Sequence, residues 1–417
     1  MLNNSKKKIQ QHKTIVKNFS YLTLLRFFSI LLPLITYPYL IKVLGTSLYG
    51  KVIFVQTIIS YFSIIIQFGF NNSATKEVAI NRDDISKLDI IVSSIFQIKF
   101  ILWVLSLSFL ILYIYIVPGA KSDKWLYLFS FGICFDELLF PQWFFQGLEK
   151  MGYITAINLF AKLIFVGLIF FIVKNENDYL WVPILYSIGA LMGGILSLYF
   201  VFRKEGIRFI FQPYGKLIYF VKESFLLFVS NIFISVKDKF NIIFLGIFLG
   251  MESVAIYDLG IKIMNLFLHP VILVNDAIFP KVAKEKDMRF VLKTIKLLFI
   301  FTLIITGIFQ FVTPLILKFF IGEQYLKAVA ISRILLISPL LFSISYSLSR
   351  NCLIVLGKYN YLLYSITITS TFYLALIGVG YVFNLLNNTI IFATITVLVF
   401  LFEMTYRIYI TLRLKLI

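Results

Sequence analysis

Apolar residues are gathered into twelve long blocks along this chain, and short polar stretches separate the blocks. A helix that crosses a bilayer needs about 20 mainly apolar residues, and each block is of about that length or longer. The blocks are also too uniformly apolar to be the alternating strands of a membrane barrel. The pattern predicts an all-α membrane protein with spans near 18–43, 51–70, 90–117, 125–147, 153–173, 180–202, 220–249, 253–280, 291–319, 326–356, 361–384 and 389–411.

The second six blocks resemble the first six. The segment LGTSLYG at 44–50 has a counterpart in LGMESVAIY at 249–257, and residues 70–79 have one in residues 274–283. Both pairs lie about 205 residues apart, which indicates that a whole half was duplicated.

The longest polar connection outside the N-terminus runs from 203 to 219, and it is the predicted linker between the two halves. We therefore expect an N-terminal six-helix lobe, 1–210, and a C-terminal six-helix lobe, 211–417. Since six is an even number of spans, both lobes begin on the same side of the membrane. The predicted pseudo-twofold axis then runs along the membrane normal.

Composition supports lipid as the solvent, because only 14% of the residues are charged and 60% are hydrophobic. The formal net charge of +19 is confined largely to alternate loops, which hold 24 Lys and Arg residues against 7 in or beside the opposite loops. The positive-inside rule then predicts that both termini lie in the cytoplasm. The basic loops suit membrane lipids with anionic headgroups, and no nucleic-acid partner is expected.

Ionisable residues inside the predicted spans are the candidates for function, because each is costly in hydrocarbon unless it faces a wet interior or a partner. Lys237, Asp238 and Lys239 interrupt the seventh block near its middle. Either two short spans are joined there by a loop, or one span from 220 to 249 carries the triplet near the bilayer midplane. The match between Gly45 and Gly250 favours one span.

Arg26 lies on the first span, where it either faces a central cavity and binds phosphate or extends its side chain to the cytoplasmic surface. The other candidates are divided between a substrate site and structural ion pairs. Within the spans, the cations exceed the anions, which favours an anionic cargo. The candidate cavity cations are Arg26, Lys162, Lys237, Lys239, Arg333 and Arg350, and the candidate coupling or ion-pair carboxylates are Asp136, Glu137 and Asp238.

Two further acidic residues carry weaker predictions. Asp258 and Lys262 are spaced i, i+4, so an intrahelical pair is expected, and Glu403 on the last span is the weakest candidate.

No catalytic, cofactor or metal-binding pattern accompanies these charges. His12 and His269 are far apart, and Cys134 and Cys352 each lie alone in a predicted span, where cysteine usually acts as a small apolar residue. The chain has no GxxxxGK[ST], GxSxG or HExxH motif. We therefore expect no cofactor, no metal and no enzymatic activity.

An ordered set of loose motifs resembles bacterial O-antigen and polysaccharide repeat-unit flippases of the multidrug/oligosaccharidyl-lipid/polysaccharide exporter superfamily. In the first half, NFS at 18–20 and YPYL at 37–40 precede LGTSLYG, and FGF at 68–70 precedes ATKE at 74–77. In the second half, Asp238 is followed by Leu245-Gly246, Gly250 and Ile256-Tyr257. The resemblance covers nearly the whole chain, which ends after twelve predicted spans, whereas the related peptidoglycan-precursor flippases have two more.

The resemblance implies movement of an undecaprenyl-pyrophosphate-linked oligosaccharide from the cytoplasmic to the periplasmic leaflet of the bacterial cytoplasmic (inner) membrane. It also implies a cationic cavity between two six-helix lobes, alternating access, and association with a polysaccharide polymerase and chain-length machinery. Arg26, Lys237 and Lys239 fit that cavity by position and sign, and Asp238 or Asp136 would be the carrier if transport is coupled to an ion.

Two alternatives remain at the level of sequence. A multidrug/cation antiporter of the same superfamily would favour acidic cavity residues. A membrane-embedded polymerase or ligase usually needs a large periplasmic loop with catalytic residues, and the longest outward loops here, 119–124 and 175–179, are only a few residues long.

Overall fold

The computed structural model describes residues 2–321 and 325–416, and the described chain is helical, with no strand. The side chains of residues 2–19 and of positions 22, 26, 27, 30, 34, 319–321 and 325 lie outside the description. The prediction of an all-α membrane protein is confirmed, since ten described segments are long and apolar enough to cross a membrane. The arrangement of twelve spans in two six-helix lobes stays a prediction.

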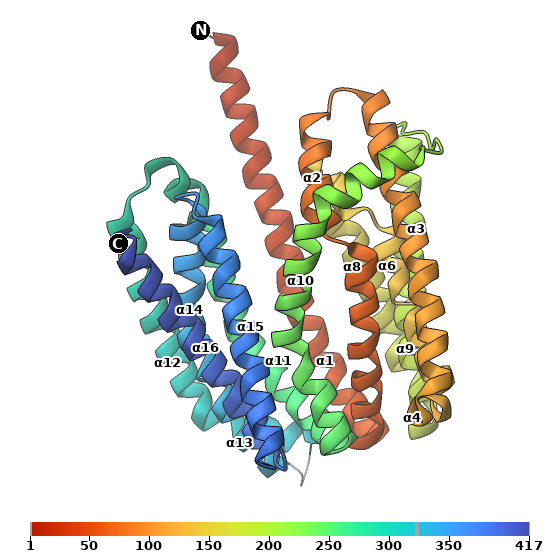
Figure 1. The fold of residues 1–417 in the computed structure, drawn as a ribbon, viewed down its shortest axis with the longest axis vertical. Coiled ribbons are helices and arrows are strands. Elements are labelled where there is room, and N and C mark those ends of the chain that lie inside the picture. Colours follow the sequence, from red (N-terminus) through yellow and green to blue (C-terminus); the bar gives the residue numbers. More distant parts are fainter. Residues whose placement is uncertain (1, 322–324, 417) are drawn as a thin grey trace. The chain divides into compact units, whose positions relative to one another are not determined.

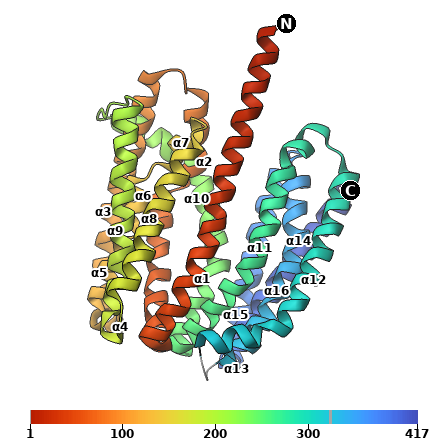
Figure 2. The ribbon, with the colours of Figure 1, turned by 180° about the vertical axis from the view of Figure 1, so that it is seen from behind.

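The N-terminal half, drawn from red to yellow-green in Figures 1 and 2, consists of long and short helices. The long ones are α1 (Leu2–Gln67), α3 (Ile85–Ile116), α8 (Met151–Ile172) and α9 (Trp181–Tyr199). The short ones are α2 (Phe70–Ile80), α4 (Pro118–Ser122), α5 (Lys124–Phe131), α6 (Cys134–Leu139), α7 (Gln142–Gly147) and the 3₁₀-helix η1 (Glu176–Leu180). A π-helical turn, η2 (Phe200–Lys204), extends α9.

The C-terminal half begins with two 35-residue helices, α10 (Tyr214–Phe248) and α11 (Met251–Glu285). They are followed by α12 (Met288–Ile321), α13 (Tyr325–Leu335), α14 (Ser338–Leu348), the π-helical turn η4 (Ser349–Ile354), α15 (Tyr359–Val382) and α16 (Thr389–Arg413).

Packing divides the chain into two compact units. Unit 1 comprises residues 1–36 and 55–232, and unit 2 comprises residues 37–54 and 233–417. α1 and α10 therefore each contribute residues to both units. The boundary that the sequence predicts between two lobes, at 210/211, stays a prediction.

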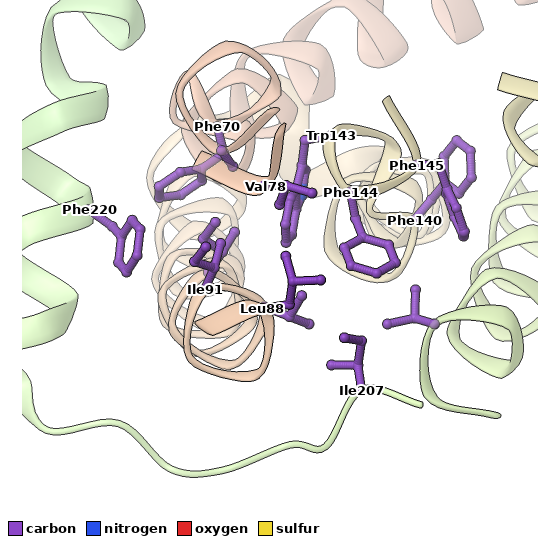
Figure 3. Packing of buried hydrophobic residues seen from close by; sticks show 14 of the residues in the cluster. Phe70, Val78, Leu88, Ile91, Phe140, Trp143, Phe144, Phe145, Ile207 and Phe220 are labelled. Atoms are coloured by element: carbon purple, nitrogen blue, oxygen red, sulfur yellow. The ribbon is translucent and has the colours of Figure 1, made fainter. Parts of the chain in front are cut away.

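The core of unit 1 is aromatic and lies where α2, α3 and α7 meet. Phe70 of α2 and the run Trp143-Phe144-Phe145 of α7 are fully buried, and Figure 3 shows Trp143 beside Val78. Ile207 closes this core from the connection between η2 and α10, as Figure 3 also shows.

That connection is fastened to α3. The Asp89 carboxylate accepts a hydrogen bond from the Arg208 amide at 2.7 Å, and the Ser93 hydroxyl accepts one from the Ile210 amide at 2.9 Å. The predicted linker is therefore a fixed part of unit 1 over these residues, because two of its backbone amides have protein partners.

The predicted continuous span 125–147 was wrong, because this stretch folds as the three short helices α5, α6 and α7. The first break lies at Gly132, and the second at Phe140, whose extended backbone precedes Pro141. Carbonyls near the breaks receive side-chain hydrogen bonds, as lipid-embedded backbone requires: Ser187 donates to the Phe129 oxygen and Ser197 to the Leu139 oxygen, both at 2.8 Å.

The counterpart in unit 2, predicted as one helix over 326–356, is also interrupted. α13 ends at Leu335, α14 restarts at Ser338 with Pro339 in its first turn, and η4 continues as a π-helix. Interrupted spans in corresponding positions of a repeat often mark the working region of a transporter.

The duplicated glycines share one backbone conformation. Gly45 has φ 74° and ψ 164° inside α1, and Gly250 has φ 83° and ψ 175° at the start of α11. This region is essentially restricted to glycine, so both copies bend the chain at the same point of the repeat. The motif identified in the sequence is therefore a conserved turn within this one chain.

Candidate functional site

The triplet at 237–239 lies within α10, which is helical without interruption from Tyr214 to Phe248. The interpretation as one span is confirmed, and the alternative of two short spans with a loop was wrong. Lys237 is partly buried, with 17% of its side chain exposed, whereas 52% of the Asp238 side chain is exposed. Lys239 is partly buried on the same turn.

Lys237 pairs with an acidic residue that the sequence ranked last. Its ammonium donates to Glu403 Oε2 of α16 at 2.9 Å, and it lies 3.9 Å from Asp238 Oδ1. The ammonium also lies 5.5 Å from the centre of the Phe400 ring. The cation predicted for the cavity therefore has an internal counter-ion.

Arg407 completes this cluster, although it was not among the candidate residues of the sequence analysis. Its side chain is only 6% exposed, and its guanidinium lies 2.5 Å from Glu403 Oε1. It also donates to the Ser365 hydroxyl at 3.1 Å and to the Ser345 hydroxyl at 2.9 Å. The i, i+4 spacing of Glu403 and Arg407 was the available signal, because such pairs meet on one helix face.

One turn further along α10, Asn241 organises a second polar group that sequence reasoning missed. Its amide nitrogen donates to Tyr257 and to Thr396, each at 2.8 Å, and its amide oxygen accepts from Tyr373 at 2.8 Å. Asn241, Tyr257 and Tyr373 are all buried. This group joins α10, α11, α15 and α16 inside unit 2.

A third cluster joins α1, on both sides of the bend at Gly45, to α11. Lys262 pairs with Asp258, as predicted from their spacing, and it donates to the Tyr49 hydroxyl at 2.6 Å. Its ammonium lies 3.3 Å from the centre of the Tyr37 ring, within the range of a cation–π contact. The Asp258–Lys262 pair of α11 is therefore also connected to α1, through the contacts of Lys262 with Tyr37 and Tyr49.

Unit 1 holds the acidic candidates of the broken span. Lys99 of α3 is buried and donates to the Glu137 carbonyl oxygen at 2.7 Å, with the Glu137 carboxylate 3.8 Å away. Asp136, the neighbouring residue, is exposed. Lys162 of α8 donates to the Ser29 hydroxyl at 2.6 Å. The structure thus assigns Glu137 to an ion pair and shows no ion pair for Asp136 among the described residues.

The remaining candidate cations occupy different settings. The Arg26 side chain lies outside the described residues, although its backbone belongs to α1. Arg333 is exposed and donates from Nε to the Gln310 carbonyl at 3.0 Å. Arg350 lies in η4, with Nε 3.1 Å from Asp276 Oδ1 and the guanidinium 4.1 Å from the centre of the Phe279 ring.

The candidate residues are distributed over both compact units. Lys237 and Lys239 are on α10 in unit 2, Lys162 is in unit 1, and Arg333 and Arg350 are on separate elements of unit 2. Among the residues that the structure describes, no group of three His, Cys, Asp or Glu side chains is arranged to hold a metal ion.

Two curated proteins are similar to this chain over most of their lengths, and both carry the name "Putative O-antigen transporter". The protein from Escherichia coli (strain K12) is 27% identical over 341 residues, which are 79% of this chain and 81% of that protein. The protein from Shigella dysenteriae is 28% identical over 347 residues, which are 82% and 87% of the two chains.

Solved structures of transporters share the fold. An inward-facing multidrug resistance MATE family transporter of the MOP superfamily has a TM-score of 0.72 and 14% identity, and the match covers 92% of this chain and 94% of that one. The lipid II flippase MurJ, in an inward closed conformation, has a TM-score of 0.64 and 14% identity over 93% and 87% of the two chains. At this identity the likeness concerns the fold alone.

The family follows from a match within the chain itself. Residues 15–286, more than half of the 417, match the family described as polysaccharide biosynthesis protein. The matched region runs through the broken span α5–α7 and both copies of the duplicated glycine turn. This helical, multi-pass membrane protein belongs to the polysaccharide biosynthesis protein family.

Proposed function

We propose that this protein is a flippase that moves a lipid-linked oligosaccharide, the repeat unit of a surface polysaccharide such as O-antigen, across the cytoplasmic membrane. The observation that carries the proposal is the match to two O-antigen transporter relatives over about four-fifths of the chain, within a polysaccharide biosynthesis family. The fold likeness to a lipid II flippase is consistent with it. The undecaprenyl diphosphate carrier is the anion that such a protein must accommodate.

The charged residues inside the helices support an anionic cargo. Lys237 and Lys239 lie one residue apart on either side of Asp238 in α10, and both keep part of their surface exposed. An ammonium can bind phosphate oxygens as a point charge, and a guanidinium can do so bidentately. We assign the first contacts with the diphosphate to Lys237 and Lys239, with Arg26, Lys162, Arg333 and Arg350 as further cavity cations.

The mechanism that we propose is alternating access between the lobes 1–210 and 211–417, with both termini in the cytoplasm. Asp238 and Asp136 are the proposed carriers for a coupling ion, because their carboxylates are exposed within otherwise apolar segments. Glu137 acts in this scheme as the ion-pair partner of Lys99. A polymerase and chain-length machinery would receive the product at the periplasmic face.

The relatives are transporters, and transport without covalent change of the lipid is the proposed activity. A multidrug antiporter shares the fold, but fold likeness at 14% identity does not select between cargoes. The family match over residues 15–286 favours the polysaccharide lipid.

A reconstituted system tests this assignment. Proteoliposomes would carry a fluorescent undecaprenyl-diphosphate disaccharide, and an impermeant reductant would measure the fraction that reaches the outer leaflet. Movement of this lipid, without movement of a phosphatidylcholine carrying the same fluorophore, is the expected result. Proton-driven uptake of a cationic dye without movement of the diphosphate lipid would instead identify a drug antiporter.

A further inference from the structure

The cluster around Glu403 contains two buried or partly buried cations and one carboxylate between them. Glu403 uses its two oxygens separately, one for Arg407 at 2.5 Å and the other for Lys237 at 2.9 Å. Its side chain is 8% exposed, so water screens these contacts poorly. The carboxylate therefore holds α10 and α16 together through charge.

Arg407 is the fixed end of this cluster. Its guanidinium donates to Ser365 of α15, to the backbone and hydroxyl oxygens of Ser345 in α14, and it pairs with Glu403. A planar guanidinium bound in several directions has little freedom to turn. Arg407 consequently holds the Oε1 atom of Glu403 in place, whether or not Oε2 is bonded to Lys237.

Lys237 is the exchangeable end. It donates one hydrogen bond among the described residues, to Glu403, and 17% of its side chain is exposed. An ammonium has three donors on a flexible stem, so it can transfer from one oxygen partner to another by a small rotation. A phosphate oxygen that reaches this exposed side competes directly with Glu403 for the ammonium.

We propose that Glu403 is a positioning residue that serves as the internal counter-ion of Lys237, and that the substrate diphosphate displaces it on binding. Without substrate, Glu403 holds Lys237 in the position that receives the diphosphate. After transport, Glu403 takes Lys237 back and so favours release. This inference rests on the proposed function, since it requires a diphosphate lipid as cargo.

In this proposal, Glu403 weakens the binding of the diphosphate and speeds its release. A structural ion pair would not have these two opposite effects. Removing Glu403 as competitor strengthens diphosphate binding and slows release. Removing a merely structural residue weakens binding and movement together, because the fold loosens.

The test uses the full chain and the double variant Glu403→Gln/Arg407→Gln. The second substitution is needed because Glu403→Gln alone leaves Arg407 without its carboxylate, and breaking a buried pair by removing one partner is strongly destabilising. The matched control is Glu285→Gln/Arg289→Gln, which makes the same change of charge at exposed positions of the α11–α12 turn. Retention on size exclusion and thermal unfolding verify that each variant is folded.

Two measurements are made on each protein in nanodiscs or proteoliposomes. The first is the Kd for undecaprenyl diphosphate, compared with that for undecaprenol, which lacks the diphosphate. The second is the rate at which a fluorescent undecaprenyl-diphosphate lipid changes leaflets. We expect the double variant to bind the diphosphate about tenfold more tightly, the effect of one charge-assisted hydrogen bond, and to move it more slowly.

Adding Lys237→Met to the double variant should abolish the gain in affinity. If the folded double variant binds the diphosphate no more tightly than the wild-type protein, Glu403 is not a competing counter-ion. If the wild-type protein does not distinguish undecaprenyl diphosphate from undecaprenol and moves no diphosphate lipid, the proposed function itself fails, and this inference fails with it.

Discussion

Tyr49 donates a 2.9 Å hydrogen bond to the carboxylate of Asp258, although 209 positions separate the two residues in the chain. Tyr49 lies in α1, four residues after the bend at Gly45, and Asp258 belongs to α11. Both lie in unit 2, which includes residues 37–54 although the rest of α1 packs in unit 1. The duplicated motif thus supplies, in its first copy, a hydroxyl partner for the helix that follows the second copy.

The Tyr49–Asp258–Lys262 group should behave as one energetic unit. Asp258→Asn leaves Lys262 as a largely buried cation without its carboxylate, and we expect a loss of about 3–5 kcal/mol in unfolding free energy. Tyr49→Phe removes one neutral donor and should cost about 1 kcal/mol. Reversible denaturant unfolding in mixed micelles measures these differences.

The matched control for Tyr49→Phe is Tyr115→Phe, because Tyr115 is 73% exposed at the end of α3. A double variant, Tyr49→Phe/Asp258→Asn, completes a double-mutant cycle. Strictly additive losses in that cycle would contradict the direct contact, since residues that share a hydrogen bond are coupled.

Gly50→Ala should destabilise the protein strongly. A Cβ at this position would lie 1.8 Å from the Met251 carbonyl oxygen, which belongs to backbone and cannot turn away. We expect a lower melting temperature and reduced insertion, measured on the purified protein. Gly167→Ala in α8 is the control, because a Cβ there meets no atom within 4 Å, and equal effects of the two substitutions would contradict the close approach.

Lys99→Met should destabilise unit 1 by about 3 kcal/mol or more, because the Glu137 carbonyl loses its donor and the Glu137 carboxylate loses its cation. Thermal unfolding monitored by exposure of Cys134, which is buried against Ser63 beside the broken span, measures the effect locally. Lys121→Met at the exposed α4 is the control. If Lys99→Met/Glu137→Gln is no more stable than Lys99→Met, the unpaired carboxylate is not the cause.

Arg26→Ala and Lys237→Ala should each lower lipid movement while the protein still inserts normally. The expected loss is on the order of tenfold, since each removes one charge-assisted contact with phosphate. The measurement is surface polymer in a flippase-deletion strain, with membrane levels determined on the same cells. Lys415→Ala near the C-terminus is the control, and full polymer display by both cavity variants would contradict their assignment to the substrate site.

The sequence predicted where the apolar segments lie, but it did not predict where the span over 125–147 breaks. Hydropathy located the apolar segments, because every backbone polar group in lipid must be satisfied within a helix. It did not show that 125–147 would break at Gly132 and Phe140, because the hydroxyls of Ser187 and Ser197 that replace the lost helical bonds come from α9. A pattern along one segment contains no information about donors on another.

For the candidate residues, too, the sequence predicted one part and only the packing showed the rest. Sequence identified Lys237 as a costly charge on a single helix, and α10 confirms that helix. Glu403 was the weakest candidate in the sequence analysis and Arg407 was not a candidate, because a charge near the end of a span can also extend to water. Only the packing of α16 against α10, α14 and α15 showed that Glu403 and Arg407 form one buried cluster with Lys237.

The amino-acid sequence by itself determined the solvent, the helical class and the internal duplication, since these follow from hydrophobicity and from a repeat that any reader of the chain can find. The matching conformations of Gly45 and Gly250 show how closely the repeat is preserved. The tertiary structure alone decided which charges on different helices meet. An ion pair depends on distances of a few ångströms between helices, and no linear pattern specifies those distances.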